Sequence, residues 1–216
     1  MSRKVAIYLH HKCYSSYIVE VINKVCRACG FTDVEEYNHR SIGGNNSYEN
    51  FSEEFKFKKG ITIFRNANTS KGILDKNVKG FHVVRDPRDM IIESAFEKVK
   101  ELSLQKVIYN EMDSLYCFYS DMASWSPLEW VTEIKAERMK DVDFYKIFIS
   151  AGLEVDINLV KMIVEESFEA RGTTKEGYGF GVEGQWKNHF NDFLKEEFSN
   201  RYSSLMKIYD YEGFNA

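Results

Sequence analysis

Near its N-terminus the chain reads Lys4-Val5-Ala6-Ile7-Tyr8-Leu9-His10-His11-Lys12-Cys13-Tyr14-Ser15-Ser16-Tyr17. The first six residues are mostly apolar and predict a buried strand, and the next five predict a loop. Ser15 and Ser16 favour the start of a helix, because a hydroxyl accepts a hydrogen bond from a backbone amide of the first turn. Apolar residues then recur at helical spacing until Gly30, which favours the end of a helix. This stretch therefore predicts a strand, a loop and a helix in succession.

The alternation of strands and helices continues along the chain. Apolar runs predict strands over 60–64 and 80–84 and a short strand within 130–138, whereas the polar residues 31–56 predict a loop. Helical spacing of apolar residues predicts helices over 88–101, 105–124, 142–151, 156–169 and 191–209. Continuous apolar strands separated by helices are typical of a parallel sheet covered on both faces. We therefore expect an α/β fold with three layers, α/β/α, around a central parallel sheet, in a single domain of residues 1–216.

Composition narrows the class of protein and of partner. Apolar residues make up 44% of the chain, charged residues 29%, and only 2 residues are proline, which excludes disordered and collagen-like classes. The net charge of -4 gives no overall attraction to nucleic acid or to an anionic membrane, so an anionic ligand would need a local basic pocket. The apolar run at the N-terminus is too short for a signal peptide or a membrane span. We expect a cytoplasmic protein without nucleic acid or membrane insertion, and the oligomeric state stays open.

The cysteines give no disulfide framework. They are four in number and irregularly spaced, which predicts reduced thiols. Cys26-x-x-Cys29 could form half of a redox or metal site, but no second pair accompanies it. Both cysteines fall on the predicted apolar stripe of the first helix, so we expect them to pack in the core.

The loop after the first strand has the chemistry of an anion site. A helix N-terminus presents unpaired amides and a partial positive charge, and Lys12, Ser15 and Ser16 add side-chain donors there. The pattern differs from a Walker A loop, because the spaced glycines are absent. The alternative is an ordinary helix cap beside a solvated lysine.

A second motif, Arg85-Asp86-Pro87-Arg88-Asp89, follows the predicted strand 80–84. An arginine at the carboxyl end of a parallel strand is well placed to bind a phosphate, since its guanidinium offers paired donors and stays charged. Alternatively, Asp86 and Pro87 only start the next helix, as a cap and a first-turn proline.

A third motif, Gly181-Val182-Glu183-Gly184-Gln185-Trp186-Lys187-Asn188-His189-Phe190, lies near the C-terminus. Two glycines three residues apart allow a sharp turn and a close approach of the backbone to a ligand. The alternative is a glycine loop followed by a helix that buries Trp186 and Phe190.

These three motifs, in this order, resemble the signatures of PAPS-dependent sulfotransferases. The first is similar to P-K-S-G-T-T-W, the second to R-D-P-R-D followed by a serine, and the third to R-K-G-x-x-G-x-W-K-N-H-F. The resemblance spans residues 5–190 and implies a P-loop NTPase-like sulfotransferase fold. It also implies a reaction, the transfer of a sulfuryl group from PAPS, 3′-phosphoadenosine 5′-phosphosulfate, to a hydroxyl or amine of a small-molecule acceptor.

The resemblance assigns residues to the parts of PAPS. Arg85 and Gly181 would meet the 3′-phosphate, and Phe168 would pack against adenine. The residues that would surround the 5′-phosphate are Lys12, Cys13, Tyr14, Ser15, Ser16 and Tyr17. Ser94 is carried as a phosphate ligand too, although Glu93 holds the position of the family serine.

The chain also departs from the family pattern. His11 and Tyr14 replace a proline and a glycine of the first motif, and Gly179 and Phe180 replace the basic pair before Gly181. Arg171 or Lys175 are the conjectured sources of the missing positive charge.

In the implied chemistry, Lys12 stabilises the leaving oxygen and no metal is expected. The general base stays open between His10, His11, Glu93 and Glu97, and both histidines could instead be buried structural residues. Two alternative functions remain. One is a PAP- or nucleotide-binding protein of the same fold without transfer activity, and the other is a P-loop-like kinase.

Overall fold

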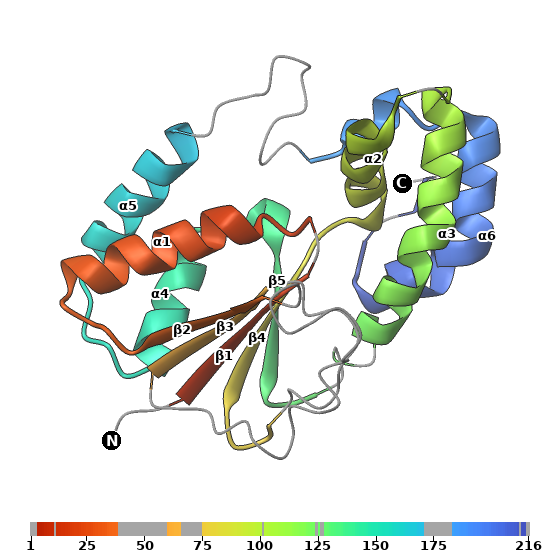
Figure 1. Cartoon of the computed structure of the whole chain (residues 1–216). Coiled ribbons are helices and arrows are strands. Elements are labelled where there is room, and N and C mark those ends of the chain that lie inside the picture. Colours follow the sequence, from red (N-terminus) through yellow and green to blue (C-terminus); the bar gives the residue numbers. More distant parts are fainter. Residues whose placement is uncertain are drawn as a thin grey trace.

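The computed structural model describes residues 4–10, 12–38, 60–65, 75–100, 102–123, 125, 128–170, 183–211 and 213–214. Figure 1 shows a twisted sheet with one group of helices, α1, α4 and α5, and a second group, α2, α3 and α6. The order of strands in the sheet is β2-β3-β1-β4-β5, and every neighbouring pair is parallel. The predicted α/β fold with a central parallel sheet is confirmed.

The bounds of the elements agree closely with the predicted ones. The strands are β1 Lys4–Leu9, β2 Val34–Asn38, β3 Gly60–Arg65, β4 Lys79–Val84 and β5 Val131–Lys135. The helices are α1 Ser15–Ala28, α2 Pro87–Lys98, α3 Leu104–Ala123, α4 Asp141–Ser150, α5 Ile157–Glu169 and α6 Asp192–Ile208. Two short 3₁₀ helices, η4 Ala136–Arg138 and η5 Gln185–Asn188, complete the described elements.

The prediction of a loop over 31–56 is wrong at β2. Among the described strands, β2 lies at the edge of the sheet and pairs with β3 alone, from Val34 opposite Ile61 to Asn38 opposite Arg65. None of Val34–Tyr37 is fully buried, so the strand needs no apolar run and carries none of the sequence signal of a central parallel strand.

One face of the sheet is covered by α1, α4 and α5. Alternate residues of β1, namely Val5, Ile7 and Leu9, belong to the same buried cluster as Ile18 and Ile22 of α1. Cys26 is buried there as predicted, but Cys29 is exposed, because the helix ends at Ala28 and the chain turns away.

The opposite face of the central strands carries a layer of aromatic rings. Tyr8 stacks on Phe64 with ring centroids 5.4 Å apart and meets Trp125 edge-on at 5.2 Å. A Cβ atom on Gly80 would lie 3.2 Å from the Tyr8 ring, so glycine at this position lets β4 pack closely under the layer.

The group of α2, α3 and α6 is held together by large side chains. Phe198 and Tyr202 of α6 stack with centroids 4.4 Å apart, and the Tyr202 hydroxyl donates to the carbonyl of Met112 on α3 at 2.6 Å. Tyr119 of α3 meets Tyr202 edge-on at 5.8 Å. These contacts hold α6 against α3, and α2 packs against the other side of α3, beyond β5 (Figure 1).

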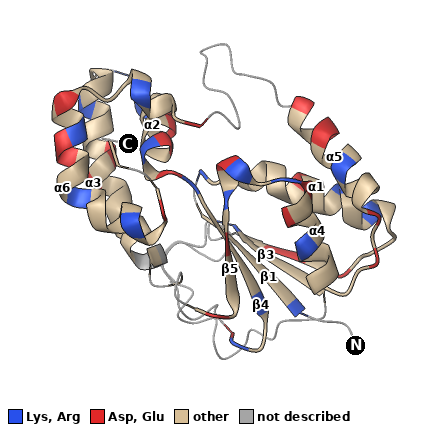
Figure 2. Cartoon of the chain, turned by 180° about the vertical axis from the view of Figure 1, so that it is seen from behind, with Lys and Arg blue, Asp and Glu red and all other residues tan. Residues whose placement is uncertain are grey.

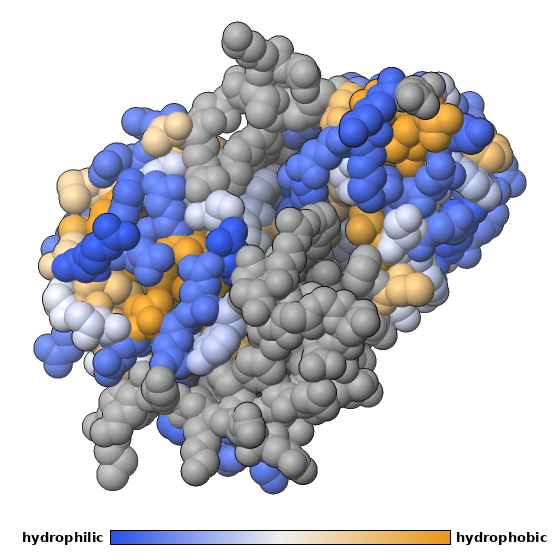
Figure 3. Space-filling view, in the orientation of Figure 1, coloured by the Kyte–Doolittle hydropathy of each residue, from blue (hydrophilic) through white to orange (hydrophobic). Residues whose placement is uncertain are grey.

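Residues of both charges alternate on the outer helices. Figure 2 shows basic and acidic residues interspersed along the outer helices, whereas the strands are largely uncharged. Hydrophilic residues cover most of the described surface in Figure 3, and the apolar patches between them are small. Within the described ranges, none of the helices combines the length and the apolar character needed to cross a bilayer.

Candidate functional site

The parallel pairing of β1 and β4 creates the site. The two strands are neighbours in the sheet and run in the same direction, so their carboxyl ends open at one edge. The loop before α1 leaves β1 there, and Arg85 leaves β4. The Nη1 atom of Arg85 donates to the carbonyl oxygen of Lys12 at 3.0 Å, although the two residues stand 73 positions apart. The structure therefore brings the first and second motifs into direct contact.

The loop before α1 adopts a strained backbone. Lys12 and Tyr14 have φ angles of 62° and 54°, in the left-handed region that costs a residue with a side chain about 1–2 kcal/mol. Tyr14 stands where the resembling family has glycine, which reaches this region without that cost. The carbonyl of Tyr14 accepts hydrogen bonds from the amides of Tyr17 and Ile18 at 3.0 and 3.1 Å and so begins α1.

The first turn of α1 points its amides into the site. The amides of Ser15 and Ser16 open the helix, where helical geometry supplies no carbonyl acceptors. The Ser15 hydroxyl donates to the carbonyl of His10 at 3.2 Å. Arg65, at the end of β3, donates to the Ser16 hydroxyl at 3.0 Å and was not among the predicted residues. Its position directly after the predicted strand 60–64 is the signal that could have identified it.

Arg85 is enclosed by the loop and by α2. Only 2% of the residue is exposed, and its guanidinium stacks over the Tyr14 ring with 4.3 Å from Cζ to the centroid. Its Nη1 atom also pairs with the carboxylate of Glu93. Burial alone would lower the pKa of Arg85, but the Tyr14 phenol and the Glu93 carboxylate raise the pKa above its ordinary value. The guanidinium therefore stays charged in its buried position.

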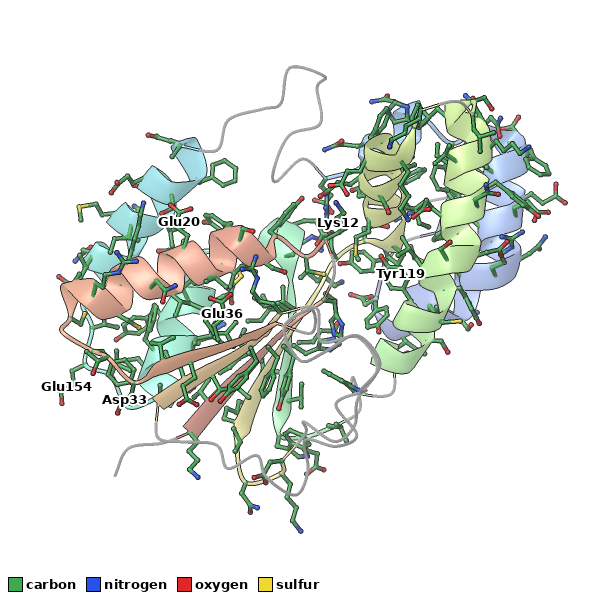
Figure 4. All side chains as sticks on the ribbon, viewed as in Figure 1. Lys12, Glu20, Asp33, Glu36, Tyr119 and Glu154 are labelled. Carbon is green, nitrogen blue, oxygen red and sulfur yellow. The ribbon has the colours of Figure 1, made fainter. Side chains whose placement is uncertain are left out.

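Two carboxylates of α2 meet the two cations of the site. Glu93 lies 3.5 Å from the Lys12 ammonium, and Glu97, one turn later, accepts a hydrogen bond from the same ammonium. The Lys12 side chain is 9% exposed, against 38% for Glu93 and 61% for Glu97. Figure 4 shows Lys12 between the start of α1 and α2. These two acidic side chains thus neutralise the positive charges of Lys12 and Arg85 in the candidate anion site.

Ser94 lies away from these cations. It is 1% exposed, and its hydroxyl donates to the Glu111 carboxylate of α3 at 2.6 Å. Since adjacent residues of a helix differ by about 100° in direction, Glu93 faces Arg85 while Ser94 faces α3. The structure does not bring Ser94 together with Arg85.

The rest of the second motif starts α2 and reaches the third motif. The Asp86 carboxylate accepts from the Arg88 amide at 2.9 Å, so Asp86 caps the helix with Pro87 in its first turn. The same carboxylate pairs with the Arg88 guanidinium at 2.6 Å. Arg88 in turn stacks on the Trp186 ring at 4.1 Å. Asp86 and Arg88 therefore have structural roles.

A buried carboxylate joins the second and third motifs. Asp89 accepts hydrogen bonds from the amides of Gly184 and Trp186 at 2.7 and 3.0 Å. Burial raises the pKa of Asp89, and these two hydrogen bonds oppose that effect. Trp186 packs edge-on against Phe190 at 6.1 Å, but across the 3₁₀ helix η5 rather than an α-helix. Gly181 lies outside the described residues, as do the positions of the missing basic pair.

Phe168 stands at the end of α5, on the side of the site formed by α1. It is 49% exposed, and its ring meets Tyr17 edge-on with centroids 6.4 Å apart. Aromatic rings stack on flat ligands, and this half-exposed ring lies beside the first turns of α1. The structure therefore brings Phe168 together with Tyr17 of the first motif.

Cys13 contributes no charge to the site. It is fully buried, and burial raises the pKa of its thiol well above the ordinary range. The neutral thiol leaves the backbone of Cys13 as the part that could bind a ligand.

Of the two histidines of the first motif, only His10 lies in the described part of the chain. His11 lies outside the described residues. His10 is 1% exposed, and its Nε2 lies 2.6 Å from the Nε2 of His82 in β4. Burial lowers the pKa of His82 to about 3, so His82 is neutral at physiological pH.

Glu137 was not predicted from the sequence. It follows β5, and its carboxylate accepts a hydrogen bond from the Asp86 amide and another from the Tyr211 hydroxyl at 3.1 Å. It thereby fixes the turn between Arg85 and α2. The signal that could have identified it is its position just beyond a parallel strand, at the same edge as Arg85.

No group of three or more His, Cys, Asp or Glu in the described part of the chain is placed to hold a metal ion. A pocket of about 550 Å³ is mixed in charge, since its lining includes Arg88, Arg138 and Lys187 together with Asp86 and Glu183.

Comparisons with known proteins identify the fold. No protein-family model matches the sequence, and no curated protein matches it. Mouse sulfotransferase SULT7A1 complexed with PAP aligns with a TM-score of 0.67 and 16% identity, over 96% of this chain and 85% of that one. Retinol dehydratase in complex with androsterone and inactive cofactor PAP aligns with a TM-score of 0.54 and 12% identity, over 99% and 83%. The chain therefore has the sulfotransferase fold that its motifs imply.

Proposed function

We propose that this chain is a sulfotransferase that moves a sulfuryl group from PAPS to a hydroxyl or amine of a small molecule. The observation that carries the proposal is the contact between the Lys12 loop and Arg85 at the carboxyl ends of β1 and β4. The fold is shared with two proteins whose structures contain PAP, the product of PAPS after transfer. If each motif only capped its own helix, nothing would require the two motifs to be in contact.

The residues at the start of α1 fit the 5′-phosphate end of this nucleotide. The first-turn amides and the hydroxyls of Ser15 and Ser16 would bind phosphate oxygens, with the positive end of the helix behind them. Arg65 adds a cation at Ser16. Cys13, Tyr14 and Tyr17 would contribute through the shape of the same loop. We propose that Arg85 and Gly181 bind the 3′-phosphate and that Phe168 packs on adenine, whereas Ser94, hydrogen-bonded to Glu111, is left out of the proposed site.

PAPS, when bound, supplies an activated sulfuryl group next to a phosphate leaving group. Lys12 would stabilise the negative charge that develops on the leaving phosphate oxygen when the sulfur–oxygen bond breaks. The acceptor's proton must pass to a base as the acceptor oxygen or nitrogen bonds to sulfur. Glu93 and Glu97 contact Lys12, whereas His10 is buried, so the two carboxylates are the better placed of the described candidates. His11 stays a candidate.

A second candidate function is nucleotide binding without transfer. It is favoured by Glu93 and Glu97, which pair with both cations of the site and so reduce the positive charge available to a leaving oxygen. Both functions share the nucleotide, so only the transfer step separates them. We further expect a small-molecule acceptor, a cytoplasmic location and no nucleic acid partner.

The proposal is tested by binding and then by transfer. Calorimetry with PAP, and with ATP plus magnesium, should show PAP binding in preference to ATP. The intact protein is then incubated with PAPS labelled on the sulfuryl group and a panel of hydroxylated and amine acceptors, with Lys12→Ala as the control. Binding of ATP without PAP would replace the proposal with a kinase, and PAP binding without label transfer to any acceptor would leave nucleotide binding alone.

A further inference from the structure

Glu93 is held at the centre of the candidate site by both of its cations. Its carboxylate pairs with the Nη1 of Arg85 and lies 3.5 Å from the Lys12 ammonium. The side chains of Arg85 and Lys12 are only 2% and 9% exposed. Another anion therefore has little access to them while Glu93 is in place. The carboxylate therefore occupies Nη1 of Arg85 and lies against the Lys12 ammonium, so an anionic ligand group would compete with it at both cations.

The Glu93 side chain has a path out of this position. It is 38% exposed, whereas Arg85 is fixed by its hydrogen bond to the Lys12 carbonyl and by the Tyr14 ring. A ligand anion that binds Arg85 must displace the Glu93 carboxylate toward solvent and so break the ion pair between Glu93 and Arg85. Otherwise the anion would lie beside the negative charge of Glu93. A ligand that carries a neutral hydroxyl there has no such obstacle, because the carboxylate can accept a hydrogen bond from the hydroxyl.

We propose that Glu93 determines specificity as an internal competitor of the nucleotide's 3′-phosphate. This inference rests on the proposed function, in which Arg85 meets that phosphate. Glu93 lowers the preference of the site for nucleotides with a 3′-phosphate over those with a free 3′-hydroxyl. The class of ligand that the site accepts thus includes adenosine 5′-phosphate compounds with either group.

The test compares two nucleotides that differ only in the 3′-phosphate, PAP and AMP. Their dissociation constants are measured by calorimetry on the full chain as wild type, Glu93→Gln and Glu93→Ser. Gln keeps the size of the side chain and removes its charge, and Ser removes both. Glu20→Gln is the matched control, since Glu20 is 34% exposed and pairs with Lys24 along α1, away from Lys12 (Figure 4). Circular dichroism confirms that each variant is folded.

We expect wild type to bind PAP less than tenfold more tightly than AMP. Both Glu93 variants should bind PAP at least tenfold more tightly than wild type does, with AMP affinity changed less than threefold. Glu20→Gln should leave both affinities within twofold.

Unchanged or weaker PAP binding in both folded Glu93 variants would overturn the inference and leave the proposed function intact. An equal gain in affinity for PAP and for AMP would overturn the inference too. The substitution would then act through the general charge of the site and not through the 3′-phosphate. If neither nucleotide binds wild type or any variant, the proposed nucleotide site itself fails, and the inference with it.

Discussion

The carboxylate of Asp89 accepts a hydrogen bond from the amide of Gly184 at 2.7 Å, across 95 positions of sequence. Its other oxygen accepts from the Trp186 amide at 3.0 Å. Asp89 belongs to the motif after β4, and Gly184 and Trp186 belong to the motif near the C-terminus. Asp89, the last acidic residue of the second motif, thus holds the turn of the third motif. This contact explains why both motifs belong to one site.

Replacing Asp89 by alanine should destabilise the protein. The substitution leaves the amides of Gly184 and Trp186 without their acceptor, at a cost of about 1–3 kcal/mol for each amide that stays buried. Urea denaturation followed by circular dichroism measures the change in the free energy of unfolding. Asp113→Ala is the control, because Asp113 is 67% exposed and its pair with Arg201 should contribute less than about 1 kcal/mol. Equal effects of the two substitutions would contradict the structural role of Asp89.

Gly184→Ala should cost about 1–2 kcal/mol through the backbone alone. The φ angle of Gly184 is +81°, which residues with a side chain rarely adopt, whereas an added Cβ would meet only the Lys187 side chain, at 3.6 Å. Gly213→Ala is the control, since a Cβ at Gly213 meets nothing within 4 Å. Thermal unfolding of both variants gives the comparison. A Gly184→Ala protein as stable as wild type would show that the turn does not need this φ angle.

Lys12→Ala should weaken PAP binding by about 1.5–3 kcal/mol, the range for a charge-assisted contact. The same substitution should abolish transfer if Lys12 stabilises the leaving oxygen. Calorimetry with PAP and a transfer assay separate the two effects. Lys24→Ala is the control and should change neither, because Lys24 lies on α1, beyond the Lys12 loop, and pairs with Glu20 and Glu166. PAP affinity that survives in Lys12→Ala would remove this lysine from the binding site.

Most of the fold could be predicted from the sequence because its central strands are buried on both faces. β1, β3 and β4 carry continuous apolar runs, and each is fully or almost fully buried. β2 could not be predicted in the same way, since an edge strand pairs on one side only and its sequence, Val-Glu-Glu-Tyr-Asn, has no apolar run. Hydrophobic patterning in a sequence identifies strands that are buried. β2 is not buried in this way, so it is defined only by its pairing with β3 in the structure.

The site could be predicted only in part. Strand ends and loop chemistry identify Lys12 and Arg85, because parallel strands place their carboxyl ends together. The ion pairs of Glu93 with both residues depend on the rotation of α2, which one sequence does not give. Arg65 ends β3 and Glu137 lies just beyond β5, but neither belongs to a motif, so their roles emerge only from their contacts in the structure.

The buried His82, next to His10, should make the protein sensitive to acid. Burial lowers the pKa of His82 to about 3, whereas the unfolded chain takes up this proton near pH 6.5. Between these values the unfolded state binds more protons than the folded state, so stability falls as the pH falls from 6.5 toward 3. The contribution of His82 is up to about 1.4 kcal/mol for each pH unit in this window. Above pH 6.5 the contribution is absent.

His82→Gln tests this dependence, because the amide can still hydrogen-bond to His10 but does not titrate. Urea denaturation at pH 7.5, 6.5, 5.5 and 4.5 should show a smaller loss of stability in His82→Gln than in wild type below pH 6.5. His189→Gln is the control, since His189 is only partly buried and burial lowers its pKa less. Parallel stability curves for wild type and His82→Gln would show that His82 is protonated equally in the folded and unfolded states, and the buried histidine pair would then have no part in acid unfolding.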